Sequence, residues 1–119
     1  MRVIKIDHVQ LAMPRGGEEK AREFYGGLLN IHEVPKPPEL AARGGCWFED
    51  GDLKVHLGAE ENFRPAQKAH PALLVENLEN LLTKLTADGV DVETKDVEGQ
   101  THAYIHDPFG NRIELLELN

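Results

Sequence analysis

Three histidines and one glutamate have residue types and spacings that suit a metal site. His8 lies in the first apolar stretch of the chain, and His70 opens a later one 62 positions on. His56 and Glu114 each lie in a strand-like stretch, 58 positions apart. Neutral imidazoles and a carboxylate are suitable ligands for the divalent ions Zn²⁺, Fe²⁺, Mn²⁺, Ni²⁺ and Co²⁺. The similar separations suggest an internal repeat, and a pseudo-two-fold axis would allow the four side chains to meet at one metal ion.

Each of these residues also has a simpler explanation when taken alone. A histidine at the start of "HPALLVEN" caps a strand at the surface as readily as it binds a metal, and Glu114 has Arg112 or Lys54 as possible ion-pair partners. Glu114 lies in "RIELLEL", however, where apolar residues occupy both sides of the strand. An ionised and unpaired carboxylate there is costly or is forced to be neutral. We therefore interpret the four residues together as one site.

The elements that must position these residues occur twice in the same order. The first half predicts a strand at Val3 to Met13 and a helix at Glu18 to Leu29. An extended edge segment, "EVPKPPEL", follows, and its three prolines exclude a central strand. The half ends in a hairpin formed by "GGCWFED" and "LKVHLGAE". The second half, after the linker-like "ENFRPAQKA", predicts a strand, a helix and three strands: "HPALLVEN", Leu78 to Ala87, "VDVETKDV", "THAYIHD" and "RIELLEL". The pattern predicts an α+β protein in which residues 1–119 form a single domain of two repeats, approximately 1–60 and 69–119.

The composition narrows the class of protein. The chain has 119 residues, of which 40% are hydrophobic and 29% charged, as expected for one globular domain. Its net charge of −8 argues against nucleic acid or an anionic membrane as the main partner, because both require clustered Lys and Arg. Cys46 is the only cysteine, so no intrachain disulfide forms. No stretch approaches the roughly 18 apolar residues of a membrane span, and we expect a cytoplasmic protein.

Four segments together resemble the vicinal oxygen chelate superfamily, which includes glyoxalase I, extradiol dioxygenases, fosfomycin-resistance enzymes, methylmalonyl-CoA epimerase and the bleomycin-binding proteins. They are "DHVQLAMP", "AREFYGGLL", "HPALLVEN" and, most specific of all, "DPFGNRIELLEL". The resemblance covers nearly the whole chain. It implies two βαβββ modules, the glyoxalase/bleomycin resistance/dioxygenase-like fold, whose curved mixed sheets surround a divalent metal.

The resemblance also implies roles for individual residues. His8, His70 and Glu114 match the family's metal ligands. His56 falls where glyoxalase I has a fourth ligand, usually Glu or Gln, so it is either a fourth ligand or an acid/base beside a three-ligand metal. Glu114 or His56 is the expected catalytic base. The polar side chains of "THAYIHD" share one face and either line the cavity or, as the sequence favours, are simply exposed: His102, Tyr104 and His106.

The function implied is that of a metal-dependent enzyme with glyoxalase I-like lyase or isomerase chemistry on a small oxygen-chelating substrate. The alternatives are a dioxygenase or fosfomycin-resistance-type metalloenzyme, and a non-catalytic binder of small molecules like the bleomycin-binding proteins. The bleomycin-binding branch lacks the metal residues, which are all present here. The sequence shows no counterpart of the glutathione-binding arginines of glyoxalase I. The resemblance therefore does not assign the substrate of glyoxalase I to this protein. A homodimer is expected by analogy, with the site either within one chain or across the dimer.

Overall fold

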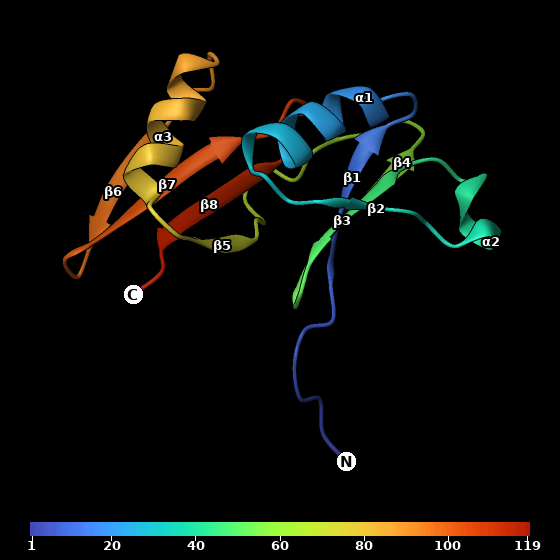
Figure 1. The fold of residues 1–119 in the computed structure, drawn as a ribbon, viewed down its shortest axis with the longest axis horizontal. Coiled ribbons are helices and arrows are strands. Elements are labelled where there is room, and N and C mark those ends of the chain that lie inside the picture. The colour runs from blue at the N-terminus through green and yellow to red at the C-terminus, as the bar shows by residue number, and fades with distance from the viewer. The chain divides into compact units, whose positions relative to one another are not determined.

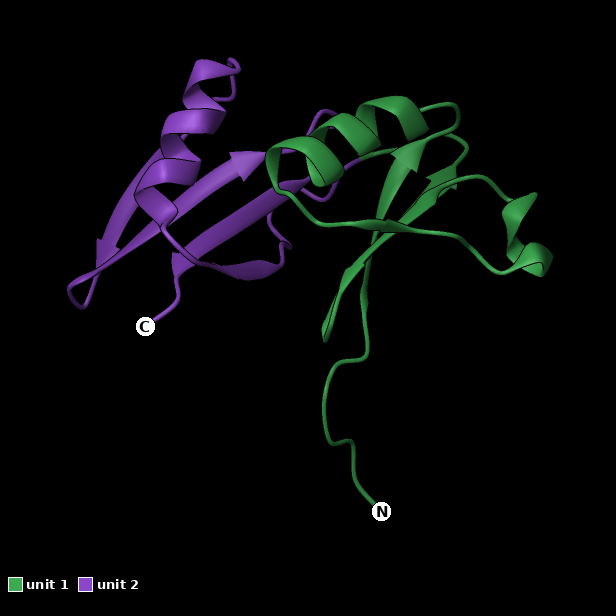
Figure 2. Cartoon of the chain, viewed as in Figure 1, with its two compact units in different colours: residues 1–64 green, residues 65–119 purple.

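The computed structural model describes residues 1–119 and divides them into two compact units, Met1–Arg64 and Pro65–Asn119 (Figure 2). The division falls within the predicted linker. Each unit contains one four-stranded mixed sheet. The α+β class and the two βαβββ modules are confirmed. None of the helices is both long enough and apolar enough to span a membrane.

The first unit follows the predicted order of elements (Figure 1): β1 (Val9–Pro14), α1 (Glu18–Ala21), η1 (Arg22–Leu28), β2 (Glu33–Val34), α2 (Pro38–Ala41), β3 (Cys46–Asp50) and β4 (Leu53–Glu60). The predicted helix is a short α-helix that continues as a π-helix. The sheet order is β1-β4-β3-β2, which places the proline-flanked β2 at an edge as expected. The short helix α2 was not predicted. Pro38 is tolerated at its first position, where a backbone N–H has no intrahelical partner.

The first strand begins later than the sequence predicts, at Val9 rather than Val3. Its parallel partner β4 begins only at Leu53, and Val9 pairs with Val55. In this register, residues before Asp7 lie beyond the end of β4 and have no strand to pair with. The apolar side chains of Val3, Ile4 and Ile6 are accordingly exposed, so the alternating pattern overestimates the length of the strand.

The second unit repeats the arrangement with β5 (Ala72–Val75), α3 (Leu78–Ala87), β6 (Glu93–Val97), β7 (Gln100–His106) and β8 (Arg112–Glu117). Its sheet order is β5-β8-β7-β6, with β5 parallel to β8. Helix α3 has the predicted bounds. Asn77 begins it in the left-handed region, and its side chain accepts a hydrogen bond from Asn80 N.

The alternation of side chains separates an apolar face from a polar face in each sheet. In the first unit, buried residues of β3 and β4 join the buried face of the helix, and Tyr25 lies 5.5 Å from Phe48 between ring centroids. In the second unit, the buried apolar residues of the strands are Ala103, Ile105, Ile113 and Leu115. His56 and Glu114 alternate with these core residues, so both point to the opposite face.

Cys46 provides a direct test of this core. Its side chain is 2% exposed, and burial raises the pKa of its thiol to about 11. We therefore expect the folded protein to resist thiol reagents, because only about one thiol in a thousand is ionised at pH 8 when its pKa is near 11. Labelling with a chromogenic disulfide should be complete only in denaturant. Labelling of the folded protein at the rate of a free cysteine would contradict the packing described for β3.

Candidate functional site

The strand register makes the four predicted residues equivalent in pairs. In the first unit Gln10 pairs with His56, and His8 lies two residues before Gln10. In the second unit Ala72 pairs with Glu114, and His70 lies two residues before Ala72. His8 therefore corresponds to His70, and His56 corresponds to Glu114. Parallel pairing of the first and last strands brings one histidine of each unit beside the matching polar residue.

In the second unit, Glu114 lies between two imidazoles. Its Oε1 is 2.9 Å from His70 Nε2, and its Oε2 is 2.5 Å from His102 Nδ1. His102 comes from β7, which pairs with β8. The sequence favoured an exposed position for His102, but its side chain is only 19% exposed. The two partners that the sequence offered Glu114 are engaged elsewhere, because Arg112 lies over the Tyr104 ring and Lys54 pairs with Asp7.

The burial of Glu114 is balanced by these hydrogen bonds. The residue is 9% exposed, which by itself favours the neutral acid. The hydrogen bond from His102, with a further contribution from His70, nevertheless holds the pKa of Glu114 below its usual value. The carboxylate is therefore ionised, with both oxygens directed at imidazole nitrogens.

His70 has a hydrogen-bond acceptor at each of its two nitrogens. Nδ1 is 2.8 Å from the backbone oxygen of Lys68, and Nε2 is 2.9 Å from Glu114 Oε1. A carbonyl and an ionised carboxylate only accept hydrogen bonds, whereas a neutral imidazole carries a single proton. The neutral ring therefore satisfies only one of the two acceptors, and a second proton or a metal ion between His70 Nε2 and Glu114 Oε1 would satisfy both.

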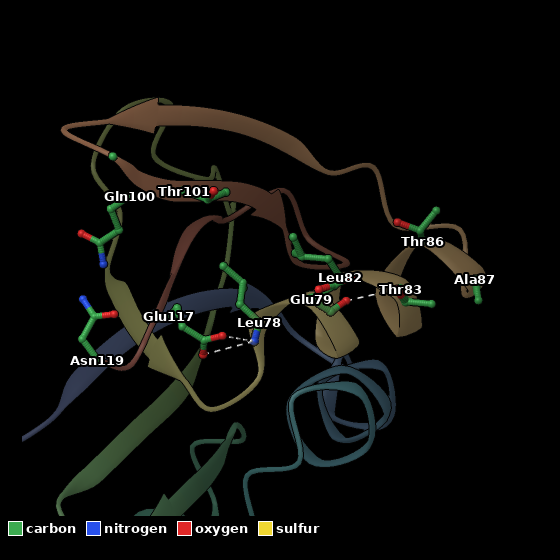
Figure 3. A pocket seen from close by; sticks show the side chains of 11 residues that line it. Leu78, Glu79, Leu82, Thr83, Thr86, Ala87, Gln100, Thr101, Glu117 and Asn119 are labelled. Carbon is green, nitrogen blue, oxygen red and sulfur yellow. Dashed lines mark hydrogen bonds between the residues drawn. The ribbon is translucent and has the colours of Figure 1, made fainter.

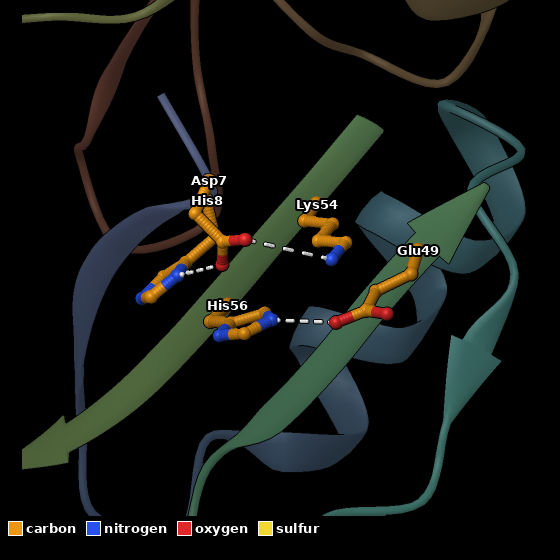
Figure 4. A network of polar contacts seen from close by, with 5 residues as sticks. All are labelled: Asp7, His8, Glu49, Lys54 and His56. Carbon is orange, nitrogen blue, oxygen red and sulfur yellow. Dashed lines mark hydrogen bonds and ion pairs between the residues drawn. The ribbon is translucent and has the colours of Figure 1, made fainter. Parts of the chain in front are cut away.

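In the first unit, His8 is oriented by an acidic neighbour (Figure 4). His8 Nδ1 is 2.9 Å from Asp7 Oδ2, and Lys54 Nζ is 3.7 Å from Asp7 Oδ1. The hydrogen bond from His8, together with the charge of Lys54, holds the pKa of Asp7 below its usual value. Since Asp7 is an ionised acceptor, Nδ1 of His8 carries the proton and Nε2 keeps its lone pair.

His56 is held more tightly than His8. It is 4% exposed, and its Nε2 is 2.7 Å from Glu49 Oε2. Its ring is stacked on His8 on one side and on Trp47 on the other, with centroid separations of 4.5 Å and 4.0 Å. The sequence analysis did not identify Glu49. Glu49 shares a face of β3 with Trp47, and only the pairing of β3 with β4 brings it to His56.

The donor set suits a divalent metal, although each unit contributes only two of the predicted residues. The structure has no group of three or more His, Cys, Asp or Glu side chains arranged to hold a metal ion. The His70–Glu114 pair has the separation expected of two neighbouring ligands, which lie about 3 Å apart when each bonds one ion at about 2.1 Å and at a right angle. Three of the residues also have their remaining polar atom fixed by a hydrogen bond, as metal ligands usually do: His8, His70 and Glu114.

A pocket lies elsewhere in the second unit (Figure 3). Its volume is about 830 Å³, and α3, the turn between β6 and β7, and the end of β8 line it. Glu117 within it already binds the backbone N–H of Leu78 at the start of α3. None of the predicted site residues lines this pocket. We take the histidine–carboxylate groups as the candidate site, because they combine titratable side chains in direct contact.

Comparison with known proteins places the chain in a family. Residues 5–115 match the model of the Glyoxalase/Bleomycin resistance protein/Dioxygenase superfamily, and the chain belongs to this superfamily. It is thus a vicinal oxygen chelate protein, as its sequence motifs indicated. No curated protein matches the chain.

Solved structures agree with this assignment. A protein described as a glyoxalase family member from Bacillus anthracis is 45% identical, with a TM-score of 0.93 and complete coverage of both chains. The fosfomycin resistance protein FosX from Listeria monocytogenes is 14% identical (TM-score 0.79, 99% of this chain and 96% of that one). Lactoylglutathione lyase from Agrobacterium tumefaciens is 20% identical (TM-score 0.73, 95% and 92%). The last two similarities establish the fold alone.

The environment of Glu114 predicts a pH dependence of stability in the metal-free protein. Because the folded protein lowers the pKa of Glu114, ionisation of this residue stabilises the fold above the usual carboxyl range. That contribution is lost as the pH falls through the lowered pKa. Glu114→Gln should cost about 2 kcal/mol in chelator-treated protein near pH 6 and progressively less below about pH 4.

Denaturant unfolding at several pH values measures this difference. Glu76→Gln, at an exposed position after β5, is the matched control and should leave the unfolding curves unchanged. A constant cost of Glu114→Gln across the acid range would show that the ionised carboxylate does not contribute as described.

Proposed function

We propose that the protein is a metal-dependent enzyme that acts on a small substrate offering two neighbouring oxygens, with lyase or isomerase chemistry of the glyoxalase I type. His8, His70 and Glu114 are the proposed metal ligands. His56 and Glu114 are the proposed proton-transferring residues.

The observation that carries this proposal is the contact between His70 and Glu114. Two acceptors face the two nitrogens of one imidazole, and the ionised carboxylate lies 2.9 Å from Nε2. In metal-free protein only a second proton on the ring satisfies both acceptors. A divalent ion would replace that proton, and Nε2 of His70 and the carboxylate of Glu114 would both be its ligands.

The surroundings support the same roles. Asp7 directs the proton of His8 to Nδ1, and the backbone oxygen of Lys68 does the same for His70. His102 occupies Oε2 of Glu114 and leaves Oε1 facing His70. Such outer partners fix the tautomer and the orientation of metal ligands.

The chemistry follows from these assignments. A bound divalent ion supplies Lewis acidity that stabilises negative charge developing on substrate oxygens. His56, enclosed beside His8, offers a nitrogen to a substrate proton, while Glu114 provides a carboxylate held in its ionised form. The chain has all the residues that match the family's metal ligands, whereas the bleomycin-binding proteins lack them. This difference favours an enzyme over a protein that only binds a small molecule.

Metal binding tests the ligand assignment. Protein purified without added metal, stripped with a chelator and titrated with Zn²⁺, Ni²⁺ or Mn²⁺ at neutral pH should bind one ion per chain. Since loss of an outer partner alone typically costs 10–100-fold in affinity, Ala at His8, His70 or Glu114 should each cost more than about a hundredfold. His106→Ala, which removes an exposed histidine of β7, should retain the affinity of the unmodified protein.

The absence of both retained and loadable metal would contradict the proposal and favour a non-catalytic binder. If metal binds, activity assays rank the reactions. Turnover of methylglyoxal with a thiol supports the lyase assignment. Turnover of catechols or of fosfomycin would replace it with a dioxygenase or a fosfomycin-modifying enzyme.

We further propose that the protein is a homodimer. Support comes from the exposed apolar side chains of Val3, Ile4 and Ile6, which no strand of their own unit covers. Light scattering should give about twice the chain mass of 13.3 kDa. Changing all three to Ser should weaken association at least about tenfold, because each aliphatic side chain buried contributes about 1.5–3 kcal/mol. Leu74→Ser, a second exposed apolar position, is the control, and a monomeric parent protein would refute the proposal.

A further inference from the structure

His56 differs from the other predicted ligands in having an aromatic or imidazole ring on each face. The interplanar angle is 22° with His8 and 3° with Trp47. Glu49 adds an in-plane contact of 2.7 Å at Nε2. Stacking fixes the plane of the His56 ring, and the hydrogen bond fixes its rotation within that plane.

Glu49 also determines which nitrogen of His56 carries the proton. A carboxylate has no proton to donate, so Nε2 donates to Glu49 and the neutral ring keeps its lone pair on Nδ1. No protein atom forms a hydrogen bond with Nδ1, and because no buried side-chain nitrogen or oxygen in the chain lacks a partner, Nδ1 has contact with solvent. Figure 4 shows the second nitrogen of His56 pointing away from Glu49.

The stacked geometry prevents His8 and His56 from binding the same ion. A metal lies in the plane of the imidazole that binds it, along the lone pair. Two rings 4.5 Å apart and inclined at 22° have planes that meet on the order of 10 Å away, whereas an imidazole nitrogen lies only about 2 Å from its metal. The second unit provides the contrast, because there the carboxylate of Glu114 meets the nitrogen of His70 rather than the face of its ring.

We infer that His56 is not a fourth metal ligand, and that Glu49 is a positioning residue that keeps Nδ1 of His56 free as a hydrogen-bond acceptor for the substrate. This inference rests on the proposed function in one respect only, which is the presence of a divalent metal ion near His56. The substrate class it defines is a small molecule that carries a hydroxyl or another polar N–H or O–H donor close to its metal-chelating oxygens. Trp47 packs against the ring and fixes its plane.

Nitrogen NMR of the histidine side chains tests the assignment on the intact protein. In metal-free protein near pH 8, His56 should show a slowly exchanging Nε2 proton and an unprotonated Nδ1. Glu49→Ala should remove the slow Nε2 proton, and Glu49→Gln, which keeps an acceptor oxygen, should partly restore it. Asp50→Asn, the next and exposed acid in β3, should change neither signal. A slow Nε2 proton that persists in Glu49→Ala would overturn the role of Glu49.

Addition of Zn²⁺ to the same sample separates the two proposals. The ligating nitrogens of His8 and His70 should shift, while Nδ1 of His56 keeps the resonance of a free lone pair. His56→Ala should lower zinc affinity at most about tenfold, the range of an outer contact, against more than about a hundredfold for His8→Ala. A zinc-dependent shift of His56 Nδ1 would overturn the inference. A complete lack of zinc response would refute the proposed function, while the metal-free spectra would still decide the role of Glu49.

Discussion

Parallel pairing of the first and last strands in each unit is the constraint on which the site depends. The register of β1 on β4 sets His8 beside His56, and the register of β5 on β8 sets His70 beside Glu114. A shift of one residue in either pairing would turn the polar side chain of the last strand into the core. The apolar neighbours Leu57 and Leu115, both about 1% exposed, prevent that shift because they would lose their burial.

The same constraint creates an electrostatic cost that neighbouring strands offset. Glu114 is a buried carboxylate between the core residues Ile113 and Leu115 of β8, and His102 of the adjacent β7 and His70 before β5 supply its partners. Glu49 plays the matching part for His56 from the adjacent β3. In both units, therefore, the third strand supplies the group that orients the polar residue of the fourth. The two units differ in which atoms meet: a nitrogen and a carboxylate oxygen in one, and two ring faces in the other.

Much of this fold follows from local sequence signals. The bounds of α3, the hairpin of β3 and β4, and the edge position of β2 agree with periodicity, turn residues and proline placement. The start of β1 was wrong because alternation in the sequence does not reveal where a partner strand ends. Helix α2 was missed because a proline-rich segment reads as extended chain, although proline also suits a first helical turn.

Sequence reasoning selected His8, His56, His70 and Glu114 from their repeat, but it undervalued the residues that orient them. His102 and Glu49 act across strand pairs, and the register that places them cannot be read from either strand alone. The face shared by His102 and Tyr104 was correctly recognised, whereas its contact with Glu114 depended on the pairing of β7 with β8. Local patterns thus identify the candidate ligands, and tertiary pairing identifies their partners.

The most direct test of this account is a crystal structure of the zinc-loaded protein with anomalous scattering recorded at the zinc edge. We expect one strong peak at bonding distance from His70 Nε2 and Glu114 Oε1, with His56 outside the coordination sphere and still hydrogen-bonded to Glu49. A peak bound by other residues, or crystals that take up no zinc at this site, would contradict it.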